Sequence, residues 1–68
     1  MTNTEAKEKI ITTMDIFGMT GVKASEIMGI THATFRNKKN DNALGHTFNE
    51  KNYTDLIEYL KAKINELP

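Results

Sequence analysis

The sequence predicts an all-α fold, a small helical bundle of about four helices in a single domain that spans residues 1–68. Apolar residues recur at intervals of three and four, which is the period of an amphipathic helix. Glycines and polar runs separate these periodic segments, and residues that commonly cap helices precede them. Strand signals are scarce. Without cysteine there are no disulfides, so helix packing alone must hold this short chain together.

The first helix is predicted over about residues 4–17. Its apolar stripe consists of Ala6, Ile10, Met14 and Phe17, with Ile11 beside it. Thr2 and Glu5 have the spacing of a capping box at its start. Gly18 is expected to end it.

Two short helices follow, over about residues 22–28 and 31–39. Thr20 or Gly21 is expected to cap the first of them, and Thr31 is a natural N-cap for the second. Gly29 separates the two. Residues 40–47 are rich in Asn and Gly and are predicted to form a polar loop.

The last helix is predicted over about residues 49–66. With Asn49 as the N-cap, Phe48 and Tyr53 have the spacing of a hydrophobic staple. The apolar stripe of this helix consists of Tyr53, Leu56, Ile57, Leu60, Ile64 and Leu67. The stripe is expected to cover the core, although its end, Ile64 and Leu67, is also suited to a second subunit or another protein.

The segment 21–39 has the features of two short helices that meet at a steep angle. Such a joint needs a residue that accepts a left-handed backbone, small side chains where the helices cross, and a large apolar anchor on the second helix. The residues that meet these needs are Gly29 at the joint, Ala24 and Ser25 at the crossing, and Phe35 with Ile30 and Met28 as the anchor.

This spacing resembles the helix-turn-helix of the Cro/CI-type, lambda-repressor-like regulators of temperate phages. In that family a small residue, a glycine four later, an aliphatic residue and an apolar residue five further on mark the motif; here they are Ser25, Gly29, Ile30 and Phe35. Ser25 departs from the more common Ala, and Lys38 stands where an apolar residue often lies. The short length and zero net charge further resemble the phage modulators of repression, which are small antirepressors.

The resemblance implies that the start of the second helix of the motif enters the major groove of DNA or contacts a partner. With Phe35 buried, the opposite face carries His32, Ala33, Arg36 and Asn37. Arg pairs well with guanine and Asn with adenine, and Ala packs on a thymine methyl group. Candidate phosphate contacts are Thr31, Lys23, Lys38 and Lys39. A plainer interpretation is that Arg36, Lys38 and Lys39 form a solvated helix end, which the helix dipole favours.

The function expected from this resemblance is a phage-type transcriptional regulator of the lysis–lysogeny switch. We expect a modulator of repression that binds the DNA-binding domain of a CI-type repressor and alters its operator binding. The alternative is an autonomous Cro-like repressor that reads DNA with the helix 31–39, and a homodimer is then expected because operator half-sites are usually read by dimers. Nine basic residues balance nine acidic ones, which excludes a polybasic coat protein.

Other function classes have little support in the sequence. No phosphate-binding glycine loop or nucleophile–base arrangement is present, so we expect neither an enzyme nor a cofactor. His32 and His46 have no cysteine or carboxylate pair near them, which argues against a metal site. The polar start of the chain lacks a signal sequence. The expected location is therefore the cytoplasm of the host cell, without a membrane partner.

Overall fold

The computed structural model describes residues 1–40 and 47–68, which form four helices and, within those ranges, no strand. The helices are α1 (Asn3–Phe17), α2 (Gly21–Met28), α3 (His32–Asn40) and α4 (Glu50–Asn65). The predicted all-α bundle is confirmed, and every predicted helix boundary lies within one residue of the observed one. Most of the predicted loop 40–47 lies outside the described residues.

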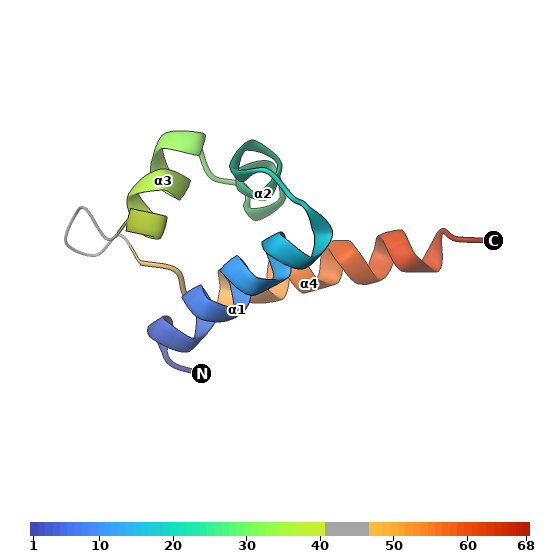
Figure 1. The fold of residues 1–68 in the computed structure, drawn as a ribbon, viewed down its shortest axis with the longest axis horizontal. Coiled ribbons are helices and arrows are strands. Elements are labelled where there is room, and N and C mark those ends of the chain that lie inside the picture. The colour runs from blue at the N-terminus through green and yellow to red at the C-terminus, as the bar shows by residue number, and fades with distance from the viewer. Residues whose placement is uncertain (41–46) are drawn as a thin grey trace.

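Two helix pairs make up the fold. α1 and α4 pack side by side and run in the same direction, while α2 and α3 lie together on one side of them (Figure 1). α2 also packs on α4. The C-terminal half of α4 extends past the other helices, so the chain ends far from the bundle (Figure 1).

Each helix begins at a polar side chain that satisfies a free backbone N–H group, as the sequence predicts. The side-chain oxygen of the cap accepts a hydrogen bond from the residue three positions on: Thr2 from Glu5, Thr20 from Lys23, Thr31 from Thr34, and Asn49 from Asn52. Thr20, and not Gly21, is thus the cap of α2. Asn52 also accepts from the Asn49 N–H at 3.1 Å, which closes a capping box at the start of α4.

Left-handed glycines end the first two helices. Gly18 has φ 61° and Gly29 has φ 70°, a conformation that costs a residue with a Cβ atom about 1–2 kcal/mol. After each glycine the next N–H group reaches back across the helix end: Met19 donates to the Met14 carbonyl at 2.8 Å and Ile30 to the Ser25 carbonyl at 3.0 Å. This pattern is a Schellman motif. It turns the chain sharply back over the helix that it leaves.

The turn at Gly18 corrects one predicted core position. Phe17 continues the α1 stripe in sequence, yet 53% of it is exposed. Because the chain reverses at Gly18, Met19 returns towards the end of α1 and packs against the core cluster. Met19 therefore takes the place that the helical period assigns to Phe17.

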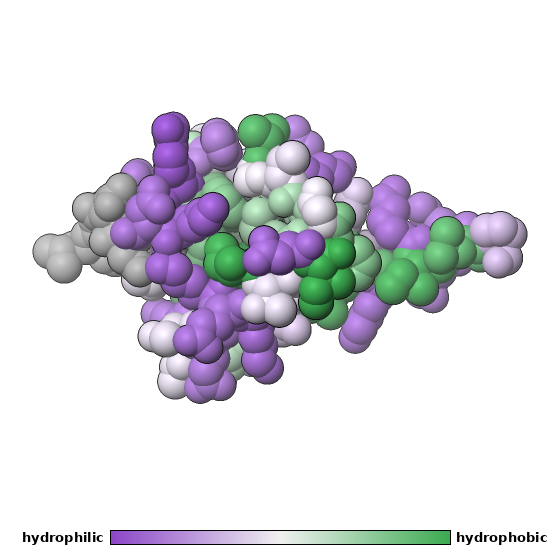
Figure 2. All heavy atoms as spheres, in the orientation of Figure 1, coloured by the Kyte–Doolittle hydropathy of each residue, from purple (hydrophilic) through white to green (hydrophobic). Residues whose placement is uncertain are grey.

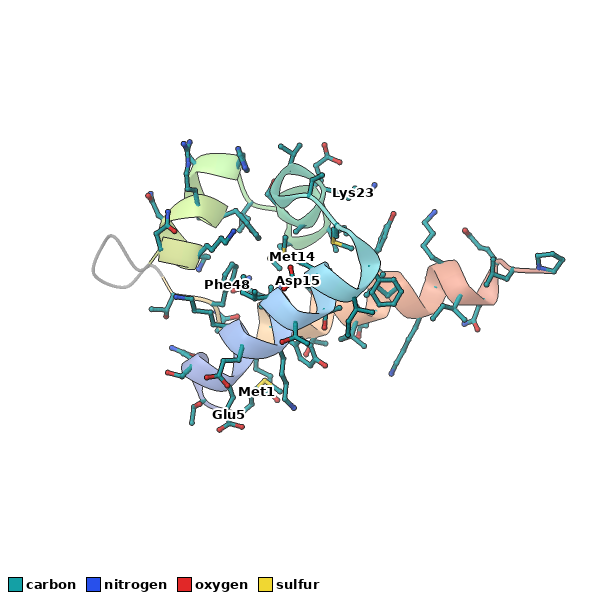
Figure 3. All side chains as sticks on the ribbon, in the orientation of Figure 1. Met1, Glu5, Met14, Asp15, Lys23 and Phe48 are labelled. Atoms are coloured by element: carbon teal, nitrogen blue, oxygen red, sulfur yellow. The ribbon has the colours of Figure 1, made fainter. Side chains whose placement is uncertain are left out.

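The core lies where the four helices meet. Its buried apolar residues are Ala6, Ile10, Met14, Ala24, Met28, Phe35, Phe48 and Leu56. Two aromatic rings lie at its centre: Phe35 of α3 and Phe48, just before α4, meet edge to face with their centroids 5.4 Å apart. Phe48 points between α3 and α1 (Figure 3). This pair joins the α2–α3 half of the fold to the α1–α4 half.

Outside the core, α4 carries an exposed ion pair in its first two turns. The Lys51 ammonium donates to the Asp55 carboxylate at 2.8 Å, one helical turn away. This hydrogen bond, together with the negative charge of Asp55, raises the pKa of Lys51 above its ordinary value. No helix in residues 1–40 and 47–68 is long and apolar enough to cross a membrane.

Candidate functional site

The candidate site is built on the joint between α2 and α3. Gly29 makes the bend, and small residues line the side of α2 that packs against its neighbours: Ala24 and Ser25 are both buried. The Ser25 hydroxyl donates to the Val22 carbonyl at 2.7 Å, so the serine is buried without an unsatisfied polar group. α2 therefore accommodates Ser25 at the position where Ala is more common in the helix-turn-helix motif that the sequence resembles.

A second glycine brings α2 and α3 close together. A Cβ atom at Gly21 would lie 3.1 Å from Cε1 of Phe35 and 3.3 Å from Nε2 of His32, which is tighter than ordinary van der Waals contact. Gly21, the first residue of α2, therefore lets the start of α3 approach. The sequence suggested Gly21 only as a helix cap, because its contact partners are eleven or more residues away.

We expect Gly21→Ala to destabilise the fold by about 1–2 kcal/mol, as overpacking does, although Ala is the better helix former. The new methyl group would push Phe35 or α3 outward. Thermal unfolding followed by circular dichroism measures this loss. Thr54→Ala, on the exposed side of α4, is the matched control and should leave the melting temperature unchanged or slightly raised. Equal melting of the two variants would contradict the close approach at Gly21.

The two faces of α3 differ sharply. Phe35 points inward, with 2% of it exposed, and the His32 ring stacks beside it with an interplanar angle of 18° and a centroid distance of 6.4 Å. His32 is exposed, but it lies beside Phe35 and not opposite it as predicted; Ala33 and Arg36 are also exposed, whereas Asn37 is half-buried. Three of the four residues predicted to face outward are thus open to a partner.

Lys38 is predicted as a phosphate contact, but the structure gives it a different environment. It follows Phe35 by three residues and is half-buried, and its ammonium donates to the Thr47 carbonyl at 2.9 Å. A lysine can cover apolar surface with its stem and place its charge at the edge. This explains how a lysine can occupy a position where the helix-turn-helix family that the sequence resembles often has an apolar residue.

Lys23 and Thr31 also make contacts inside the molecule. The Lys23 ammonium lies 5.2 Å from the centre of the Tyr59 ring, and Lys63 approaches the same ring at 5.5 Å. These are cation–π contacts, and the first ties the start of α2 to α4. The Thr31 hydroxyl donates to the Thr34 hydroxyl at 2.9 Å, so its proton is used within α3. Sequence periodicity could not show the contact between Lys23 and Tyr59, because it depends on how α2 packs against α4.

Two of the predicted basic contacts, Arg36 and Lys39, are exposed on α3. α3 carries no acidic residue, so its outward face is positive although the chain has no net charge. The cationic group of Arg36 lies one turn from the small side chain of Ala33. Such a face suits a partner that offers acceptor groups around an apolar contact.

The structure shows a cavity away from this face. A hollow of about 480 Å³ opens between α1 and the chain that leads into α4, with Lys7, Ile11, Thr47 and Phe48 in its wall. None of the predicted site residues lines it. Among the residues that the structure describes, no three histidine, cysteine, aspartate or glutamate side chains come together as metal ligands; His46 lies outside them.

Comparison with known proteins adds no assignment: the chain matches no family model, no curated protein and no solved structure.

Proposed function

We propose that this protein is a phage-type helix-turn-helix regulator of the lysis–lysogeny switch. It binds the DNA-binding domain of a CI-type repressor through the outward face of α3 and so alters the operator binding of that repressor. The observation that carries the proposal is the α2–Gly29–α3 arrangement, in which Phe35 is buried while Ala33, Arg36 and the His32 ring beside Phe35 are exposed.

The charge distribution favours a protein partner over DNA alone. The three lysines predicted to contact phosphates and Arg36 make about four basic contacts, which correspond to a slope of log K against log salt of about −3.6 at roughly −0.9 for each neutralised phosphate. Lys23 and Lys38 are held by Tyr59 and Thr47. The two that remain, Arg36 and Lys39, support a slope of only about −1.8 for each chain. Non-specific DNA affinity comes almost entirely from this electrostatic term.

A protein interface does not need several basic residues for its affinity. Its buried centre is depleted of charge and enriched in aromatic residues and arginine, and a few anchors supply most of the binding energy. On α3 the exposed guanidinium of Arg36 would be the anchor, with His32 and Ala33 as the flat surface beside it. A repressor held on this face either loses access to its operator or binds it as a joint complex.

A Cro-like repressor remains the second candidate, on one specific observation. α3 has an exposed arginine, an exposed alanine and no acidic residue. In the major groove, arginine reads guanine and alanine contacts the thymine methyl group. In this case Lys23 and Lys38 would exchange their internal contacts for phosphates.

Gel-shift titration of operator DNA tests the proposal. We expect the purified protein alone to give no shift at physiological salt, and to change the shift produced by a CI-type repressor. Arg36→Ala should weaken this change about tenfold or more, as the loss of an interface anchor does, without altering the melting temperature. Lys51→Ala, an exposed basic residue on α4, is the matched control and should behave as the wild type.

Three results would count against the proposal. A tight, salt-sensitive operator shift by the protein alone would favour the Cro-like candidate. A full effect of the Arg36→Ala variant on the repressor would show that α3 is not the working surface. An equal loss in the Lys51→Ala variant would reduce the result to an unspecific effect of charge.

A further inference from the structure

The chain that enters α4 is held from two sides at Thr47. The Lys38 ammonium of α3 donates to the Thr47 carbonyl at 2.9 Å. The side-chain amide of Asn3, the first residue of α1, donates to the Thr47 hydroxyl at 3.2 Å. We call Asn3, Lys38 and Thr47 the Thr47 clasp. It joins the C-terminal part of α3 to the beginning of α1.

The clasp lies where α3 has few other supports. Within the described residues, α2 is the one helix that packs extensively on α3. A further connection to the α1–α4 half of the fold runs through the chain before α4, with Phe48 against Phe35 and Thr47 against Lys38. Phe48 is fully buried, and burial of this large side chain holds the chain in place without the clasp. The clasp can therefore open while the fold stays intact.

The clasp draws Lys38 away from the outward face of α3. Lys38 follows Phe35 by three residues, which places the two on the same side of the helix, and it is half-buried. Arg36 and Lys39 are exposed, and Figure 2 shows hydrophilic side chains over α3. To join these two cations at a phosphate, the Lys38 ammonium must leave the Thr47 carbonyl. This costs free energy, because the bond is partly buried and the carbonyl loses its donor.

We propose that the Thr47 clasp is an autoinhibitory contact that withholds Lys38 from the phosphates of DNA. With the clasp closed, α3 offers two cations, Arg36 and Lys39; with the clasp open, it offers three. When a binding-competent state is only fractionally populated, the apparent affinity falls in proportion to that fraction. The clasp thus lowers the affinity of α3 for the DNA backbone. This inference rests on the outward α3 face of the proposed function, but it does not need the repressor.

Fluorescence anisotropy with a labelled DNA duplex of arbitrary sequence tests the clasp, over a series of salt concentrations below the physiological one. Asn3→Ala removes one half of the clasp without changing α3 or its charge. It should raise the DNA affinity about twofold to fivefold, which is the share of one hydrogen bond. The slope of log K against log salt should steepen from about −1.8 towards about −2.7, because one more phosphate is neutralised.

Two controls separate this effect from a general change in the protein. In the Lys38→Met background, Asn3→Ala should change neither the affinity nor the slope, because methionine keeps an apolar stem but has no charge to release. Thr4→Ala alters the exposed polar neighbour of Asn3 on α1, outside the clasp, and should behave as the wild type. The amide signals of the protein in the same DNA titration give a second readout. Thr47 and the buried Phe48 should shift together with Arg36 in the wild type, and Arg36 alone should shift in Lys38→Met.

An Asn3→Ala variant with the affinity and slope of the wild type would overturn the proposal. So would an equal gain from Asn3→Ala in the Lys38→Met background, since the gain would then not come from Lys38. Thr47 and Phe48 signals that stay in place while Arg36 responds to DNA would also refute it. All of these measurements use DNA without a repressor, so their outcome is independent of whether this protein binds one.

Discussion

Phe35→Ala is expected to leave the chain largely unfolded. Phe35 of α3 is almost completely buried. Its ring meets the ring of Phe48 edge to face. Truncation of a buried phenylalanine costs about 3–5 kcal/mol. A chain of this length has a total stability of about 3–10 kcal/mol at 0.05–0.15 kcal/mol per residue. Circular dichroism at 25 °C should show reduced helicity and a melting transition that is lowered or absent.

The chain offers a control of the same residue type. Phe17 lies at the end of α1 with about half of its surface exposed, so Phe17→Ala should cost much less than Phe35→Ala. A cooperative, wild-type melting curve for Phe35→Ala would show that the ring does not anchor α3. Comparable losses in the two variants would contradict the burial difference between them.

Phe48→Ala is expected to have an effect of similar size, about 3–5 kcal/mol, for a different reason. Phe48 is fully buried although it belongs to no helix: it lies directly before the Asn49 cap of α4. Its loss would open a cavity beneath Phe35 and free the entry of the chain into α4. Urea unfolding monitored by circular dichroism measures the lost stability.

Each alanine variant is expected to lose much of the total stability of the fold. The contact between the rings is therefore best measured with milder substitutions. Phe35→Leu, Phe48→Leu and the double variant form a double-mutant cycle. An edge-to-face pair contributes about 0.5–1.5 kcal/mol beyond area burial, and we expect coupling in that range. Strictly additive losses would contradict the aromatic contact.

Local rules predicted the helices of this protein well because each helix carries its own start and stop signals. Thr2, Thr31 and Asn49 were recognisable as caps, Gly18 as a helix end and Gly29 as a left-handed joint, from chemistry confined to a few residues. The bend at Gly29 and the burial of Phe35 followed from the same spacing. These features depend on neighbours in sequence, which periodicity and capping rules describe.

The features that the sequence did not predict depend on how the helices pack against one another. Met19 replaces Phe17 in the core because the chain folds back at Gly18, which the helical period alone cannot express. Lys23 and Lys38 stay predicted phosphate contacts, but the sequence did not show that their ammonium groups contact Tyr59 and Thr47 within the molecule. Such contacts join residues from different elements, so they become visible only after the helices are placed.

The central claim is that the outward face of α3 is the working surface and that its partner is a repressor. A heteronuclear NMR titration of the labelled protein with the repressor's DNA-binding domain tests it most directly. We predict that the amide signals of His32, Ala33 and Arg36 shift first and most, and that operator DNA alone leaves them unmoved at physiological salt. Shifts confined to α1 or to the end of α4, or the same α3 shifts with DNA alone, would contradict the claim.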